Sequence, residues 1–161
     1  MEKDMKKIKV FIIAIAIWFV LSPILFYSAI VITNNCIAAD VERKLIKCHL
    51  PENTQIISSI SVAAKMRGNG NGMQYMGSIL VRSDLSEEQL LAYYNTKIDG
   101  IEVKEQKDSY IDFIHSPLRF FDVPADMDFE NCYSIIYIEY DADNYFNGAI
   151  TELLDFDIRG H

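Results

Sequence analysis

The feature that most constrains this chain is an uncharged stretch near its beginning. No charged residue occurs between Val10 and Ala39, and the most apolar part runs from Val10 to Ile32. A helix rises about 1.5 Å per residue, so residues 10–32 span roughly 35 Å, whereas the hydrocarbon core of a bilayer is about 30 Å thick. The stretch therefore predicts one transmembrane helix over residues 10–33.

A cleaved signal peptide is the main alternative. Its apolar core is only about 7–15 residues long, so the longer stretch here favours a retained anchor. A lipoprotein signal carries small residues before its cysteine, but Cys36 follows Asn34 and Asn35. Ala38 and Ala39 are small residues beyond the apolar run, and they leave processing as an alternative.

Several residues are expected to lie inside the membrane. Pro23 lacks a backbone N–H and predicts a kink near the middle of the helix. Trp18 is expected near the middle of the bilayer, where it contacts lipid or a partner helix, and Tyr27 nearer the outer end. The predicted membrane-spanning residues include Val10, Trp18, Pro23, Tyr27 and Ile32.

Basic residues on the two flanks predict the orientation. Residues 1–9 carry four lysines, whereas the first basic residues beyond the apolar run are Arg43, Lys44 and Lys47. Because basic flanks remain on the cytoplasmic side, residues 1–9 are predicted to be a cytoplasmic tail and the remainder extracytoplasmic.

The remainder of the chain is acidic. Residues 34–161 hold 11 Lys plus Arg against 21 Asp plus Glu, a net charge of −10. A nucleic-acid partner is therefore not expected. Ten of the acids lie in Asp122–Asp157, a segment without Lys or Arg. This segment predicts either a solvated surface or a face for cations or a basic partner.

Residues 34–50 read as a helical juxtamembrane stalk. Ile37, Val41 and Leu45 recur at helical spacing, and Pro51 is expected to end the helix. Residues 51–161 are then predicted to form an extracytoplasmic domain.

Alternation of apolar and polar residues predicts most of the strands of this domain. The first strand covers residues 55–66, with Ile56, Ile60 and Val62 on one face, and the second covers 73–81. Glycine and asparagine at 67–72 predict a hairpin turn between them. Further strands are expected at 101–106, 110–115 and 133–140, with the second of these pairing to the first, and a loop at 117–131.

One helix has a clear beginning. Ser86 and Gln89 predict a capping box, and Leu85 and Leu90 a hydrophobic staple, for a helix that runs to about Thr96. Residues 150–158 fit either a helix or a strand. The predicted fold class is α+β, an N-terminal transmembrane helix followed by a small antiparallel-sheet domain with one or two packed helices.

The sequence contains no complete motif for nucleotide binding, calcium binding or catalysis. The run GNGNG at 68–72 lacks the residues of a dinucleotide or Walker loop and precedes a strand rather than a helix. The run DADNYFNG at 141–148 has Tyr145 and Phe146 where an EF-hand needs Asp or Asn and then Gly, which leaves an irregular cation site as an alternative. No local motif joins a nucleophile to His49, His115 or His161. We therefore predict no catalytic residue, no metal site and no cofactor.

The cysteines and the tyrosines can each be interpreted in two ways from the sequence. Cys48 and Cys132 are expected either to pair or, together with Cys36, to remain free thiols. The aromatic residues supply either core or interface area, and we expect core for most of them. These are Tyr75, Tyr93, Tyr94, Tyr133, Tyr137 and Tyr140.

The run SILVRSDLSEEQLLAYY at 78–94 resembles small membrane-anchored proteins of Gram-positive bacteria. The resemblance covers about a tenth of the chain and implies an extracytoplasmic envelope protein, without assigning any residue a role. The leading hypothesis is a non-catalytic single-pass protein in contact with the lipid bilayer, whose outer domain binds another envelope component. The alternatives are an anchored hydrolase that uses His115, and a module that binds small ligands or cations.

Overall fold

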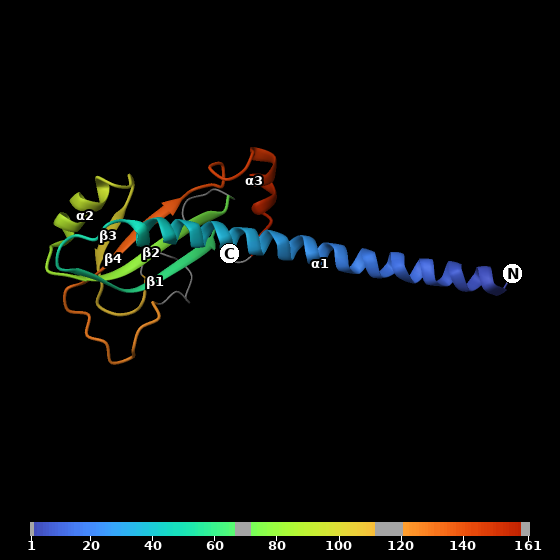
Figure 1. Ribbon diagram of the computed structural model, residues 1–161, viewed down its shortest axis with the longest axis horizontal. Helices are drawn as coiled ribbons and strands as arrows, with labels where there is room; N and C mark the ends of the chain where they lie inside the picture. Colours follow the sequence, from blue (N-terminus) through green and yellow to red (C-terminus); the bar gives the residue numbers. More distant parts are fainter. Residues whose placement is uncertain (1, 67–71, 112–120, 159–161) are drawn as a thin grey trace.

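The computed structural model describes residues 2–66, 72–111 and 121–158. The fold is α+β, with a long N-terminal helix, a four-stranded antiparallel sheet and two further helices (Figure 1). In chain order the elements are α1 (Glu2–Lys47), β1 (Thr54–Ala64), β2 (Gln74–Ser83), α2 (Glu87–Asn95), β3 (Glu102–Glu105), β4 (Cys132–Glu139) and α3 (Gly148–Leu154).

Helix α1 has two parts with different surroundings. It contains 46 residues without a break, which corresponds to a length of about 69 Å. Its N-terminal half projects away from the rest of the molecule, and its C-terminal half lies along the sheet (Figure 1). The first buried side chain is Ile30. By length and composition, α1 could cross a membrane.

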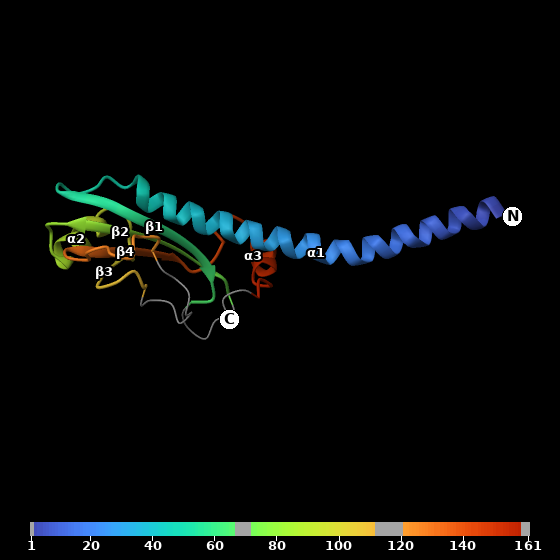
Figure 2. The ribbon, with the colours of Figure 1, turned by 90° about the horizontal axis from the view of Figure 1, so that it is seen from below.

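Figure 2 shows that α1 changes direction within its projecting half. Pro23 lies inside this helix, and it has no N–H to donate to the preceding turn. A missing bond of this kind and the bulk of the proline ring are recognised causes of helix bends.

The predicted stalk is corrected by the structure. Residues 34–47 are helical as expected, but they belong to the core of the domain. The side chains of Val41 and Leu45 are fully buried, and Ile37 is 3% exposed. The apolar stripe that helical spacing revealed is covered by the sheet, so α1 enters the domain without an intervening spacer.

The sheet has the strand order β1-β2-β4-β3, and every pair is antiparallel. Four predicted strands are confirmed, with ends within a few residues of β1 to β4. The predicted pairing of 101–106 with 110–115 is not seen among the described residues, where β3 pairs with β4 and Val103 lies opposite Ile135. Tyr110 and Ile111 lie outside this sheet, and residues 112–115 are not among the described residues.

A bulge in β1 corrects the predicted faces of that strand. The pairing with β2 shifts between Ile56 and Ser58. Because an extra residue reverses the alternation of side chains, Ile57 packs on the same side as Ile60 and Val62, whereas Ile56 packs on the α1 side. Ile60 and Val62 therefore do not share a face with Ile56, although strict alternation had placed them together.

Both faces of the sheet are covered. On one face lie α1 and α2, which contact alternate residues of β2 and β4 such as Ile79 and Ile135. On the other face, the segment between β3 and β4 packs Ile111 and Phe121 against Met76 and other residues of the sheet. The two central strands therefore contact other elements on both faces of the sheet.

Close contact between α1 and the sheet depends on one glycine. A Cβ atom placed on Gly77 of β2 would lie 2.5 Å from the backbone nitrogen of Glu42 and 2.6 Å from its Cα atom. No real Cβ atom tolerates such a distance to backbone atoms. The absence of a side chain at this position lets the helix approach the middle of the sheet.

Helix α2 begins as the sequence predicted. The Ser86 side chain accepts a hydrogen bond from the Gln89 N–H, and the Gln89 side chain accepts one from the Ser86 N–H. Leu85 and Leu90 lie in the same apolar cluster, as the staple requires. The ambiguous stretch at residues 150–158 is helical up to Leu154, the end of α3, and continues as an irregular tail.

Candidate functional site

The projecting half of α1 presents apolar side chains on all sides. Of the predicted membrane-spanning residues, Val10 and Trp18 lie there and are both 67% exposed, whereas Ile32 is 61% exposed but lies two positions beyond Ile30, the first buried residue. Pro23 is exposed as well, and Tyr27 is half-buried. In water such a surface is unfavourable over this length, which makes the helix a candidate for contact with lipid.

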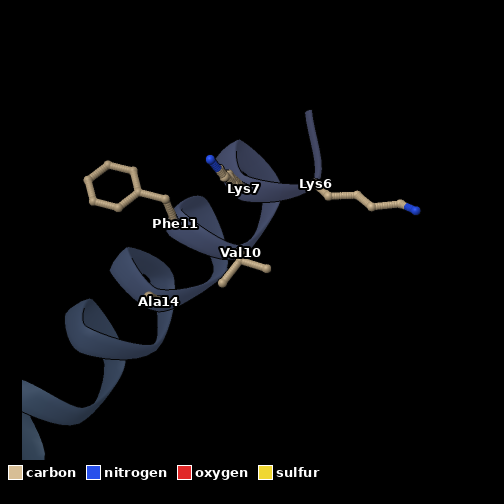
Figure 3. Close-up of a pocket in the computed structure, with 5 residues that line it drawn as sticks. All are labelled: Lys6, Lys7, Val10, Phe11 and Ala14. Carbon is tan, nitrogen blue, oxygen red and sulfur yellow. The ribbon is translucent and has the colours of Figure 1, made fainter. Parts of the chain in front are cut away.

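The first turns of α1 mark the change from basic to apolar side chains. In Figure 3, Lys6 and Phe11 point to opposite sides of the helix, and the ammonium groups of Lys6 and Lys7 lie at the end that precedes Val10 and Ala14. The shallow hollow between these side chains is lined by α1 alone. It is the surface of a single helix rather than an enclosed site.

A buried polar cluster lies where α1 meets the domain. Asn34 of α1 is fully buried, and its Nδ2 atom donates to the Leu154 carbonyl oxygen at 3.1 Å and to Asp157 Oδ2 at 3.0 Å. The Tyr75 hydroxyl donates to Asn34 Oδ1 at 2.8 Å. Burial, followed by the nearby carboxylates of Asp155 and Asp157, holds the pKa of Tyr75 above its usual range.

A second polar cluster lies further along α1. Lys44 donates a hydrogen bond to Glu139 Oε1 at the end of β4, and its ammonium group lies 5.3 Å from the centre of the Tyr145 ring. The Tyr145 hydroxyl donates to Asp40 Oδ2 at 3.2 Å. Partial burial lowers the pKa of Lys44, but the hydrogen bonds and attraction to Glu139 and Tyr145 outweigh it, so the pKa lies above its usual value.

Together the two clusters fasten the last part of the chain to α1. The Asn34 cluster holds the end of α3, and the Lys44 cluster holds the connection between β4 and α3. Sequence analysis missed both, because the contacts from α1 to Asp157 and to Glu139 join residues 123 and 95 positions apart. The available signal for the Asn34 cluster was the pair of asparagines at 34 and 35, directly after the apolar run. The described contacts of both clusters join the segment after β4 to α1.

The acidic segment Asp122–Asp157 is not a uniform solvated face. Glu139 and Asp157 are buried and bound to α1, whereas most of the other carboxylates are exposed. Asp141 and Asp143 form part of a turn, because Asp141 Oδ1 accepts the Asp143 N–H at 3.0 Å and Asp143 Oδ1 accepts the Thr151 hydroxyl. Among residues 2–66, 72–111 and 121–158, no group of three His, Cys, Asp or Glu side chains could hold a metal ion.

The structure describes only part of the glycine-rich run and of the histidines that were considered as binding or catalytic residues. Of the run GNGNG, only Gly72 is described, so the predicted turn lies outside the described residues. His115 and His161 also lie outside them. His49 is exposed beyond the end of α1, and its carbonyl oxygen accepts a hydrogen bond from the Tyr93 hydroxyl at 2.9 Å.

The three cysteines are free thiols. Cys48 packs on the α1 face of the sheet and Cys132 on the opposite face, so the sheet separates them. Burial raises the pKa of the Cys48 thiol. Cys36 is exposed on α1, two positions beyond Asn34.

The tyrosines divide between core and surface. Tyr75 and Tyr94 are buried, and Tyr140 is 58% exposed. Tyr93, Tyr133 and Tyr137 are half-buried and pack against apolar clusters. The expectation of core positions is therefore confirmed for two of the six and is wrong for Tyr140.

No protein-family model, curated protein or solved structure was found to match this chain.

Proposed function

We propose that the chain is a single-pass membrane protein that displays a non-catalytic domain on the outer side of the cell membrane, where it binds another component of the cell envelope. The observation that carries the proposal is the continuity of α1. One helix provides both an exposed apolar segment long enough to span a bilayer and the element that covers one face of the sheet.

The surroundings of the two halves support retention of the helix in lipid. Cleavage near Ala38 or Ala39 would remove Asn34 and Ile37 from the fold, and with them the buried polar cluster and part of the core. The domain therefore gains its stability from residues that a cleaved leader would take away. This favours the anchor over the signal-peptide alternative.

The charge distribution supports the orientation. Lys6, Lys7 and Lys9 are exposed on the first turns of α1, where they would face the cytoplasmic surface of the membrane. The domain at the other end would lie outside, held close to the bilayer because no linker separates it from the span.

Strand β1 supports a role in binding. It is an edge strand of 11 residues without a charged residue or a proline, and within the described part of the chain it pairs with β2 alone. Proteins normally protect such edges with charges, prolines or short strands. The partner we propose is an envelope protein that adds an extended segment to this edge.

Labelling of single cysteines tests the topology. In a Cys36→Ser, Cys48→Ser background, the only native cysteine left is the fully buried Cys132. In this background Asp108→Cys places the one exposed thiol on a turn of the domain, and Lys7→Cys places it on the first turns of α1. A membrane-impermeant maleimide added to intact cells should label residue 108, and it should label residue 7 only after permeabilisation. Labelling with the reverse pattern, or release of the protein by carbonate, would overturn the proposal.

Site-specific photo-crosslinking tests the binding surface. A crosslinker at Gln55, the exposed position of β1, should capture one envelope protein in intact cells. The same crosslinker at Glu105, on the short charged edge strand β3, is the matched control. Equal products at the two positions, no product at Gln55, or a product with twice the mass of this chain would each contradict the proposed partner.

A further inference from the structure

We infer that the end of the chain forms a second membrane contact, which rests at the boundary between lipid and water beside α1 without crossing the bilayer. The inference depends on the membrane location proposed above. The surface concerned consists of Ile150, Leu153, Phe156 and Ile158, and we refer to these four residues as the apolar foot.

The apolar foot gathers most of the exposed apolar area of the domain. Beyond α1, five large hydrophobic side chains are exposed among the described residues, and four of them form this surface, with Tyr140 as the fifth. Phe156 is 64% exposed and Ile158 70% exposed. Side chains of this kind gathered in one short segment, rather than scattered, indicate an interaction surface.

The polar cluster at Asn34 fixes the direction of these side chains. Leu154 and Asp157 point inward, where Leu154 belongs to the same buried apolar cluster as Ile30 and Asp157 accepts a hydrogen bond from Asn34. Phe156 and Ile158 flank Asp157 and are therefore held outward. The tail is thus anchored to α1 by a buried carboxylate while its apolar side chains face away from the domain.

The position of the foot matches the expected surface of the membrane. Asn34 lies only two residues beyond Ile32, the last residue of the predicted apolar run, a rise of about 3 Å along the helix. Figures 1 and 2 both show α3 on the side of the domain nearest to the projecting half of α1, and α3 runs across α1 rather than along it. A short helix in this orientation would lie in the plane of the bilayer surface.

The charged residues near the foot indicate whether headgroup charge or insertion of apolar side chains drives its contact with lipid. Glu152 lies within α3 and is exposed, and Asp141 and Asp143 are exposed in the preceding turn. Residues 122–158 contain ten acidic residues and no Lys or Arg, and one arginine, Arg159, follows them in the sequence. The net charge of this segment therefore does not favour anionic headgroups. We infer that the four side chains of the foot insert into the apolar region of the bilayer that lies directly beneath zwitterionic headgroups.

Fluorescence quenching of the full chain in phosphatidylcholine vesicles tests the inference. The native Trp18 is first replaced by phenylalanine, and Phe156→Trp then provides a single tryptophan in the foot. Because residue 156 is expected near the headgroup end of the acyl chains, bromines there should quench its emission more strongly than bromines at the chain ends. Ile158→Trp should behave alike, and both sites are exposed, so the larger ring disturbs no core contact.

Two controls separate this inference from the membrane proposal itself. Ile46→Trp in the same background places tryptophan at an exposed position near the far end of α1, and its emission should be unaffected by brominated lipid. In the unmodified chain, Trp18 should be quenched most by bromines at the chain ends. Quenching of Trp18 without quenching at residues 156 and 158 would overturn the foot alone. No quenching at Trp18 would overturn the membrane span.

Discussion

At the scale of single residues, Gly77 controls how closely α1 approaches the sheet. In Gly77→Ala the new methyl group meets the backbone of Val41 and Glu42, so the helix must move away from β2. We expect the free energy of unfolding to fall by about 2–3 kcal/mol, the usual cost of a forced group in a packed core. Urea unfolding of the full chain in detergent micelles, followed by circular dichroism, measures the change.

Gly148→Ala is the matched control for this substitution. Nothing lies within 4 Å of the Cβ atom that it adds, and the residue begins α3. Stability should stay the same or rise by up to about 0.5 kcal/mol, because alanine restricts the unfolded chain and favours a helix. Equal effects of the two substitutions would contradict the close contact at Gly77.

Two buried tyrosines differ in one hydrogen bond. The Tyr75 hydroxyl binds Asn34, whereas the Tyr94 hydroxyl is buried without a partner among the described residues. Tyr75→Phe should therefore lower the free energy of unfolding by about 1–2 kcal/mol, and Tyr94→Phe should leave it unchanged or raise it by up to about 1 kcal/mol. Chemical unfolding of both variants under one set of conditions compares them directly, and a loss at Tyr94 as large as that at Tyr75 would refute the assignment.

At the scale of elements, the beginning of α2 depends on a local motif. Ser86→Ala removes the side-chain oxygen that accepts the Gln89 N–H, and stability should fall by about 1 kcal/mol. Ser86→Asn keeps an accepting oxygen at the same position and should restore most of the loss. If alanine and asparagine give the same midpoint of urea unfolding, the capping box contributes nothing.

At the scale of the whole molecule, buried tyrosines and Lys44 determine how stability depends on alkaline pH. Burial raises the pKa of Tyr94 to about 12, and it also raises the pKa of Tyr75. Because the folded state keeps these protons longer than the unfolded chain, whose tyrosines titrate near pH 10, the contribution is complete below about pH 10. It is lost as the pH rises through the folded-state pKa. The raised pKa of Lys44 acts in the same direction.

We therefore expect the free energy of unfolding to decrease above about pH 10. The Tyr94→Phe variant lacks one of the titrating groups, so its stability should decrease less steeply over that range. Unfolding midpoints measured at several alkaline pH values test the expectation. An unchanged slope in the variant would show that Tyr94 does not contribute.

Local patterns in the sequence were sufficient for much of the secondary structure. The apolar length of α1, the capping box of α2 and the alternation that predicted β1, β3 and β4 each depend on residues a few positions apart, and the structure confirms these elements. The candidate membrane segment belongs to the same class, because length and lack of charge alone predict it.

The tertiary structure alone decided how these elements combine. The partner of β3, the burial of Val41 and Leu45 beneath the sheet, and the anchoring of Asp157 on Asn34 all join residues distant in sequence. The bulge beside Ile57 depends on register with β2, so alternation within β1 could not reveal it. Local periodicity records which side of an element is apolar, but the surface that covers that side is supplied by another part of the chain, and only folding brings the two together.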